Sequence, residues 1–221
     1  DEVNAELKAI TPDSIDPETI KVLDPACGSG HILVEAYNVL KSIYEERGYR
    51  SRDIPKLILE NNLFGIDIDD RAAQLAGFAL MMLARNDDRL TFTRDVKLNI
   101  LSLQETANAD LNSIWRELEI QDNDQYQIVQ DIWTRFEQAK TFGSLIDIPV
   151  KYEPSLKVLL SKLTEIEQTG SLLQSPAARD LKPIIQQACL LAQRYDAVVA
   201  NPPYIGGKGM NAEIKMFAKN N

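Results

Sequence analysis

The amino-acid sequence predicts an α/β protein with part of a Rossmann-like, doubly wound and mostly parallel sheet, into which a run of helices is inserted. Three observations lead to this prediction. Short apolar strands alternate with amphipathic helices over residues 21–104, a glycine-rich turn follows the first strand, and helical patterns fill residues 105–194 before one last strand. Strands that alternate with helices of this length form right-handed βαβ units, which build a parallel sheet.

The first two parts of the chain differ in character. Residues 1–20 form a polar lead segment, in which Pro12 and Pro17 mark turns. Residues 21–104 form the α/β half, whose strands are short and apolar and whose helices repeat apolar residues at helical spacing. The predicted order is a strand in 21–26, a helix over 30–48, a strand in 62–69, a helix over 70–87 and a strand within 96–103.

Residues 105–194 read as a helical insertion. Apolar residues keep helical spacing there, with acidic and Gln-rich faces between the apolar rows. The last helix of this part is predicted over residues 181–194, with Pro183 near its first turn, where proline is tolerated. Residues 195–221 then hold a fourth strand, the turn that follows it and the start of the remaining sheet.

The composition is typical of a protein of the reducing cytoplasm. Of the 221 residues, 44% are hydrophobic and 26% are charged, and no apolar run approaches the ~18–20 residues of a membrane span. The acidic start has no signal-peptide pattern. Cys27 and Cys189 lie far apart, and together with a single histidine they cannot make a zinc site. We therefore expect no disulfide framework, no metal and no membrane association.

The net charge limits what these residues can bind. It is −9 at neutral pH, with a pI of about 4.8, whereas affinity for DNA or RNA comes largely from Lys and Arg side chains that neutralise phosphates. We expect little nucleic-acid affinity from these residues alone. Because the sequence starts with Asp instead of Met, we interpret it as a piece of a longer protein. The charge does not exclude a catalytic piece whose nucleic-acid contacts lie elsewhere in that protein.

A glycine-rich turn, DPACGSG at residues 24–30, links the first strand to the first helix. In a doubly wound sheet a ligand binds at this end, where Gly28 and Gly30 allow φ values closed to other residues and the helix presents free N–H groups. A tight turn without a ligand is the alternative. The turn has neither the GxGxxG spacing of a dinucleotide site nor the Lys of a P-loop, which argues against those ligands.

The second strand ends in the acidic run FGIDIDD. An acid at that end of a strand is placed to accept hydrogen bonds from ribose hydroxyls, and Asp67 is the candidate. Ile68 would offer an apolar wall to a purine ring. We expect Asp69 and Asp70 to cap the following helix, and the alternative for all three acids is a solvated helix start.

Near the C-terminus, the stretch VVANPPYIGGKGMN places Asn201 directly after a buried strand. Pro202 and Pro203 lack backbone donors and have a fixed φ, so we expect a rigid turn, and Tyr204 follows them. Such a turn presents an amide side chain and an aromatic ring in fixed positions.

Together, VLDPACGSGHILVEA, LFGIDIDDRAAQLA and YDAVVANPPYIGG resemble motifs I, II and IV of the S-adenosylmethionine-dependent DNA adenine-N6 methyltransferases of the gamma order. The wording is especially similar to the large adenine methyltransferases of BREX phage-defence systems, the PglX group. The motifs cover well under half of the chain. The resemblance implies a class I methyltransferase fold. It also implies catalytic roles for Asn201, Pro202, Pro203 and Tyr204, and binding of S-adenosyl-L-methionine by Asp24, Pro25, Ala26, Cys27, Gly28, Gly30, Asp67 and Ile68.

The resemblance implies a mechanism as well. In this family the Asn side-chain oxygen and the carbonyl of the next proline accept hydrogen bonds from the exocyclic amine of a flipped-out adenine, on which the aromatic residue stacks. These acceptors favour a pyramidal nitrogen, which frees its lone pair for attack on the sulfonium methyl. The function implied is DNA adenine methylation in phage defence or restriction–modification. Double-stranded DNA would bind mainly beyond Asn221, other phage-defence proteins would be partners, and the isolated fragment would be inactive.

Some alternatives stay open. After the third strand, only Asn99 and Ser102 are candidates to contact the adenine of the cofactor, and we find no counterpart of the upstream segment that covers it in the family. Protein-glutamine and some RNA-guanine methyltransferases use a similar NPPY turn, but the long insertion before the turn favours the DNA adenine group. A non-catalytic scaffold with this fold is the alternative of another class, and the intact glycine turn and NPPY residues argue against it.

Overall fold

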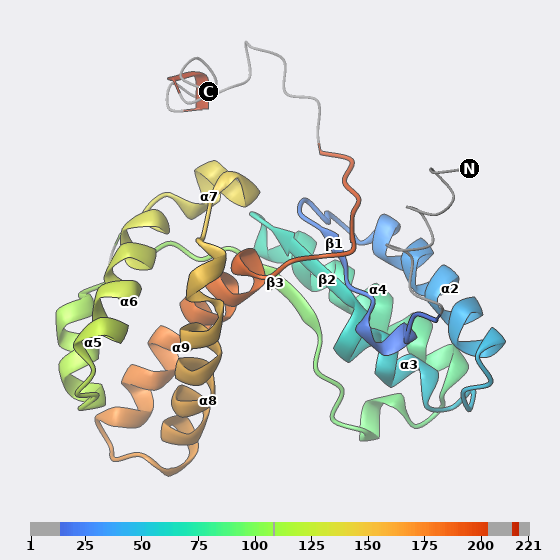
Figure 1. The fold of residues 1–221 in the computed structure, drawn as a ribbon, viewed down its shortest axis with the longest axis horizontal. Coiled ribbons are helices and arrows are strands. Elements are labelled where there is room, and N and C mark those ends of the chain that lie inside the picture. The colour runs from blue at the N-terminus through green and yellow to red at the C-terminus, as the bar shows by residue number, and fades with distance from the viewer. Residues whose placement is uncertain (1–13, 108, 203–213, 217–221) are drawn as a thin grey trace, which may run out of the picture.

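A computed structural model describes residues 14–107, 109–202 and 214–216 (Figure 1). Within them, four strands form one parallel sheet in the order β3-β2-β1-β4. The chain moves outward from β1 to β3 and then returns to the other side of β1, so the strand order reverses between β1 and β4. In doubly wound sheets, ligands bind at the carboxyl ends of the strands beside such a reversal. The strands are β1 (Val22–Asp24), β2 (Leu63–Asp67), β3 (Asn99–Ser102) and β4 (Ala197–Val198).

Two long helices cover one face of the sheet. They are α2 (His31–Glu46), which follows β1, and α4 (Asp70–Asp87), which connects β2 to β3 and matches the helix predicted over residues 70–87. The chain reaches β2 through the short α3 (Ile54–Leu57) and a short π-helix at Ile58–Asn62. Buried residues at helical spacing form one apolar cluster on this face: Leu33, Tyr37, Leu40 and Tyr44 from α2, and Ala76, Leu80 and Ala84 from α4.

The opposite face of the sheet packs against helices that lie between β3 and β4 in the chain. In β2, Leu63 belongs to the cluster of α2 and α4, whereas Phe64 and Ile66 belong to the cluster of these other helices, because side chains alternate along a strand. Phe64 makes an edge-to-face contact with Tyr195, with 5.3 Å between the ring centroids. The sheet therefore lies between two groups of helices (Figure 1).

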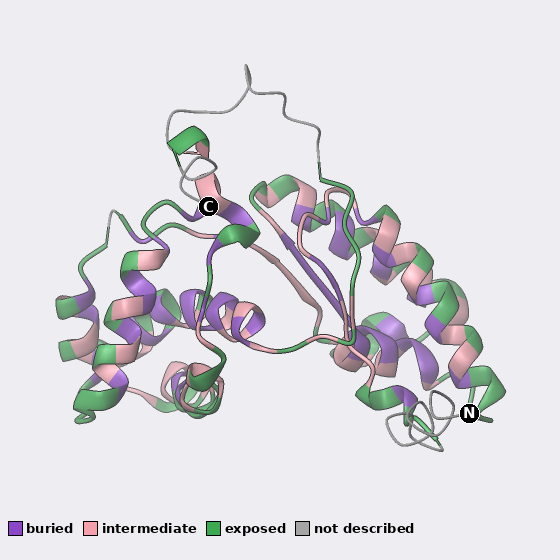
Figure 2. Cartoon of the chain, turned by 45° about the horizontal axis from the view of Figure 1, so that its top comes forward, coloured by how far each residue is buried: buried purple, intermediate pink, exposed green. Residues whose placement is uncertain are grey.

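Within the described residues, five α-helices lie between β3 and β4; we call them the interstrand helices. Asp110 and Asp122 cap two of them, since each side chain accepts a hydrogen bond from a backbone N–H of the first turn. Figure 2 shows buried positions on the inward sides of the helices and on the central strands. The helices are α5 (Leu111–Leu118), α6 (Asn123–Arg135), α7 (Ala139–Phe142), α8 (Glu153–Thr169) and α9 (Gln174–Ala192), and 3₁₀ turns lie at Pro17–Thr19, Thr91–Thr93, Gly143–Leu145 and Val150–Tyr152.

The helix α9 begins earlier than the sequence predicts. We expected it over residues 181–194 with Pro183 near its first turn, but it starts at Gln174 and carries Pro183 in its interior. A proline inside a helix removes a hydrogen bond and costs roughly 3 kcal/mol. The turns before the proline bury Ala177, Ala178 and Leu181 in the apolar cluster of the interstrand helices, and this packing offsets the cost.

These observations confirm an α/β fold with a parallel sheet and with helices that precede the last strand. The division of the chain at residues 20, 104 and 194 stays a prediction. One apolar cluster runs from the interstrand helices onto the sheet, so the two parts share a core. In the part of the chain that the structure describes, no helix is long and apolar enough to cross a membrane.

Candidate active site

The turn after β1 is built around Asp24 and two glycines with positive φ. Asp24 is buried, with 1% of its surface exposed, and its Oδ1 accepts a hydrogen bond from the Ala26 N–H at 3.1 Å. The Gly30 N–H donates to the Cys27 carbonyl at 2.8 Å, which closes the turn onto α2. Gly28 and Gly30 have φ angles of +52° and +85°, in the left-handed region that glycine adopts without strain.

The two glycines face different surroundings. A Cβ on Gly30 would lie 3.0 Å from both Cα and Cβ of Ala76, so this glycine lets α2 and α4 approach closely. A Cβ on Gly28 would meet nothing within 4 Å. Gly28 is therefore the glycine whose backbone borders open space, where a ligand can approach.

Asp67, at the end of β2, joins the two N-terminal motifs directly. Its Oδ2 accepts a hydrogen bond from the Gly28 N–H at 2.8 Å, and its Oδ1 accepts one from the Asp69 N–H at 2.9 Å. The Cys27 N–H donates to the Ile66 carbonyl at 2.9 Å. The sequence predicts that β1 and β2 end near each other, but not that this carboxylate anchors the glycine turn. Each carboxylate oxygen keeps a further lone pair that a ligand can use.

Burial perturbs two ionisable groups in the turn. It raises the pKa of the Asp24 carboxyl above its ordinary value; the Ala26 hydrogen bond opposes this shift, and the nearby Asp67 charge adds to it. Burial also raises the pKa of the Cys27 thiol to about 12. Because the thiol stays protonated at neutral pH, Cys27 is unsuited to act as a nucleophile. Its buried side chain packs in the turn as a small apolar group.

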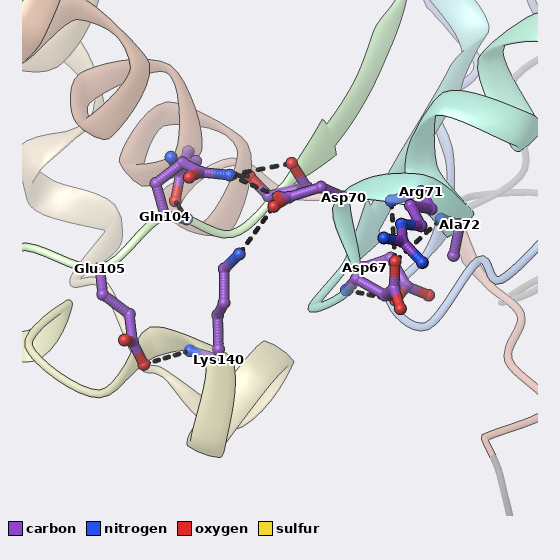
Figure 3. A network of polar contacts seen from close by, with 10 residues as sticks. Asp67, Asp70, Arg71, Ala72, Gln104, Glu105 and Lys140 are labelled. Carbon is purple, nitrogen blue, oxygen red and sulfur yellow. Dashed lines mark hydrogen bonds and ion pairs between the residues drawn. The ribbon is translucent and has the colours of Figure 1, made fainter.

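The acids after β2 have two different roles. Asp69 is the N-cap of α4, as predicted, because its Oδ1 accepts hydrogen bonds from two N–H groups of the first turn. The same prediction for Asp70 is wrong, since its carboxylate turns toward the interstrand helices, where charged and amide donors bind it. It accepts from Lys140 Nζ at 2.9 Å and from Gln104 Nε2 at 2.8 Å (Figure 3). Hydrogen bonds, first that of Lys140 and then those of Ser102 and Gln104, lower the pKa of Asp70 to about 2.

Ile68 and Pro25 lie at the same edge of the sheet. Ile68 is 48% exposed, as an apolar wall for a ligand requires. Pro25 borders a cavity of about 360 Å³ that Val198 and residues 144–147 also line. A larger cavity of about 640 Å³ lies between α4, β3 and α9; it reaches Asp70 but not the glycine turn.

The register of β3 separates the two candidates for contact with a cofactor adenine. Asn99 begins the strand, and its Nδ2 donates to the carbonyls of Leu59 and Glu60 at 3.3 and 2.9 Å. Ser102 ends the strand and pairs with Asp67. Of the two, only Ser102 therefore lies at the carboxyl edge with the other candidate residues.

The strand β4 leads toward the predicted catalytic turn, but the prediction of a buried strand is wrong there, since β4 spans only Ala197–Val198 and Val198 is 60% exposed. It pairs in parallel with β1, so both strands end at the same edge of the sheet. Asn201 and Pro202 follow β4 and are exposed. Pro203 and Tyr204 lie outside the described residues. Among the residues that are described, no group of three His, Cys, Asp or Glu side chains is placed to hold a metal ion.

Sequence reasoning missed the polar residues around Asp70. Gln187, on α9, is 2% exposed, and its Oε1 accepts a hydrogen bond from the backbone N–H of Gln104 at 2.9 Å. Lys140 lies 70 residues from Asp70 in the chain. No motif surrounds Lys140, Gln104 or Gln187 in the sequence, so only the tertiary structure brings them to notice.

Comparisons with known proteins agree with the three motifs. The family model described as MmeI, DNA-methyltransferase domain, matches residues 14–220. The adenine-specific methyltransferase BrxX of Escherichia coli O9:H4 (strain HS) is 56% identical over 99% of this chain. The adenine-specific methyltransferase PglX of Lacticaseibacillus casei (strain Zhang) is 33% identical over 90% of it. The chain spans 20% and 17% of the lengths of these two relatives.

Proposed function

This chain belongs to the family of MmeI-type DNA-methyltransferase domains, and we propose that it forms the cofactor-binding half and the catalytic turn of a longer DNA adenine-N6 methyltransferase. One observation carries the proposal. The three segments with methyltransferase motifs end at one edge of the sheet, with Asp24 at the end of β1, Asp67 at the end of β2 and Asn201 after β4. The adenine-specific names of the two relatives support adenine as the target.

The proposed cofactor is S-adenosyl-L-methionine, at the carboxyl ends of β1 and β2. The residues present fit it: Gly28 leaves room beside the backbone, Asp67 offers carboxylate oxygens to ribose hydroxyls, and Ile68 exposes an apolar surface to a purine. When bound, the cofactor supplies an electrophilic methyl group. The other proposed members of the site form the turn itself: Asp24, Pro25, Ala26, Cys27 and Gly30.

Asp24 has an electrostatic role in this proposal. Its carboxyl is buried beside the Asp67 carboxylate, and both circumstances disfavour its negative charge. A cation next to the turn would relieve this situation, and the cofactor carries an ammonium group. We therefore assign Asp24 to the binding of the methionine part of the cofactor.

Asn201 is the proposed activator of the target amine. The nitrogen of an aryl amine is a weak nucleophile, because its lone pair is delocalised into the ring. The Asn201 side-chain oxygen and the Pro202 carbonyl would accept hydrogen bonds from the amine, favour a pyramidal nitrogen and free the lone pair. Pro202 and Pro203 would hold these acceptors in place, and Tyr204 would stack on the base after it leaves the duplex.

The proposed substrate is double-stranded DNA, bound mainly through parts of the longer protein beyond residue 221. The net charge of −9 supports this division, because cationic side chains would have to come from elsewhere. We extend the proposal to a cytoplasmic role in phage defence or restriction–modification, in which other defence proteins are partners.

The experiment that tests this function identifies the methylated molecule. Deletion of the full-length gene should abolish N6-methyladenine at a defined DNA sequence in the host genome, and the wild-type gene should restore it. Unchanged adenine methylation with loss of a methyl group from a protein glutamine or an RNA guanine would assign the chain to one of those two groups. If the full-length protein binds the cofactor but its deletion removes no methyl group from DNA, RNA or protein, the result would favour a non-catalytic scaffold with this fold.

A further inference from the structure

Polar contacts tie the interstrand helices to the carboxyl edge of the sheet (Figure 3). Lys140, on α7, forms an ion pair with Asp70 at the start of α4, and its backbone N–H donates to Glu105 Oε1 at 3.2 Å. Gln104 Nε2 bridges Asp70 and Ser102, the last residue of β3, at 2.8 and 3.0 Å. These contacts hold α7 against the ends of β2 and β3.

The segment that follows Lys140 approaches the proposed site itself. We call α7 and the 3₁₀ turn after it, residues 139–145, the α7 segment. Gly143 in this segment has a φ of +57°, and a Cβ there would lie 3.2 Å from Cγ2 of Ile68. The missing side chain therefore lets the backbone of the α7 segment come close to the apolar residue that follows Asp67. Since Ile68 remains 48% exposed, the contact forms a rim and leaves the apolar surface accessible.

We propose that the α7 segment is one wall of the purine end of the cofactor site, and that Lys140 is a positioning residue that holds this wall in place through Asp70. The inference rests on the proposed function, because it assumes a cofactor over Asp67 and Ile68. Ile68 covers one side of the purine, and the backbone at Gly143 limits the space beside it. The interstrand helices thereby influence how tightly the cofactor binds.

The Lys140–Asp70 ion pair is suited to position the α7 segment, and it contributes little to the stability of the fold. Its side chains are 38% and 47% exposed, so water and salt screen their attraction. The hydrogen bonds around Asp70 nevertheless keep its carboxylate ionised down to acidic pH, since they lower its pKa to about 2. Removal of the Lys140 charge should therefore leave the fold intact and release the α7 segment from the edge of the sheet.

The test measures KM for S-adenosylmethionine and kcat at saturating cofactor with the full-length protein and its DNA substrate. Lys140→Met should raise this KM about two- to fivefold, the range that a partly exposed pair can supply. It should leave kcat and Tm unchanged, because Lys140 touches no reacting atom. Lys140→Arg keeps the charge and should bring KM back near the wild-type value.

Two further variants distinguish the effect of the ion pair on KM from the effect of the position of the α7 segment. Asp70→Asn should raise KM by a factor similar to that of Lys140→Met. The double variant should raise KM little further, because both substitutions remove the same ion pair. Gly143→Ala leaves the charges alone. It should also raise KM, since the new Cβ forces Ile68 and the α7 segment apart and is strained at positive φ.

Lys157→Met is the matched control. Lys157 also belongs to the interstrand helices and pairs with Glu153 at 2.7 Å, but it lines a cavity with Asn99 at the amino end of β3. An unchanged KM in a folded Lys140→Met protein would overturn the inference, as would an equal rise in Lys157→Met. A wild-type protein that binds no S-adenosylmethionine by calorimetry would overturn the proposed function itself, and this result is known before any variant is measured.

Discussion

Asp67 shows how one side chain can couple two motifs that lie apart in the sequence. Its two carboxylate oxygens accept hydrogen bonds from the N–H groups of Gly28 and Asp69, so it fixes the glycine turn and the start of the helix after β2. An acceptor that is already held in place needs no reorganisation when a ligand binds to it. The residue therefore acts on the shape of the site as well as on its charge.

The first prediction follows from these bonds. Asp67→Ala should weaken binding of S-adenosylmethionine to the full-length protein by about 1–3 kcal/mol, measured by calorimetry, because hydrogen bonds to the ribose and to the turn are lost. Asp69→Ala is the control at the same edge. It removes the cap of α4, which costs about 1 kcal/mol of stability, and should leave affinity nearly intact. Unchanged affinity in Asp67→Ala would remove the ribose role from this residue.

We expect the affinity for S-adenosylmethionine to depend on pH because of Asp24. Burial raises the pKa of this carboxyl, so it takes up a proton at a higher pH than an exposed Asp does. In the proposed role of Asp24, the ammonium group of the cofactor binds the carboxylate form. Affinity should therefore fall as the pH decreases through the raised pKa, and it should recover above it. Calorimetry over a series from neutral to acidic pH measures this, and Asp24→Asn should bind more weakly at neutral pH without the same dependence. Identical pH profiles for the two proteins would exclude the charge role.

At the scale of elements, the contact between α2 and α4 depends on Gly30. This residue combines a φ of +85° with a 3.0 Å approach to Ala76, whereas Gly28 combines a φ of +52° with open space. Both changes to alanine carry backbone strain, but only Gly30→Ala adds a clash between helices. It should lower the free energy of unfolding by about 1–3 kcal/mol more than Gly28→Ala does. Urea unfolding measures this as a shift in midpoint at constant slope, and equal losses would contradict the account.

Elements with local signals could be predicted from the sequence, and those that depend on tertiary packing could not. The bounds of α4 match the prediction because Asp69 caps it and its apolar residues repeat at helical spacing. The predicted start of α9 is wrong because a proline such as Pro183 usually lies in the first turn of a helix, whereas α9 begins at Gln174. The burial of Ala177 and Ala178, which keeps the helix continuous, is visible only in the folded protein.

At the scale of the whole molecule, the acidic net charge limits how strongly these residues can bind DNA. Residues 1–221 alone should bind duplex DNA weakly at physiological salt, because a charge of −9 repels phosphates. Fluorescence anisotropy with a labelled duplex at several salt concentrations measures this affinity. Sub-micromolar, salt-sensitive binding by this segment would contradict the proposed division of labour with the rest of the protein.

The candidate site was predictable as far as its position depends on topology. Parallel strands end at one edge of a sheet, so motifs after β1, β2 and β4 could be expected to meet there. The Lys140–Asp70 pair was not predictable, because it joins residues far apart in the chain and Asp70 has the local pattern of a helix cap. The role of Asp67 as an anchor for the glycine turn also depends on distances that no sequence pattern contains.

We propose above all that Asn201 activates an adenine amine in DNA for methyl transfer. The most direct test compares the rate of N6-methyladenine formation in duplex DNA by the full-length wild-type protein and by Asn201→Ala. We expect Asn201→Ala to lower the rate by a factor on the order of 10²–10³ and to leave the affinity for S-adenosylmethionine nearly intact, because the hydrogen bond acts mainly in the transition state. Methylation by Asn201→Ala at the wild-type rate would contradict the proposal.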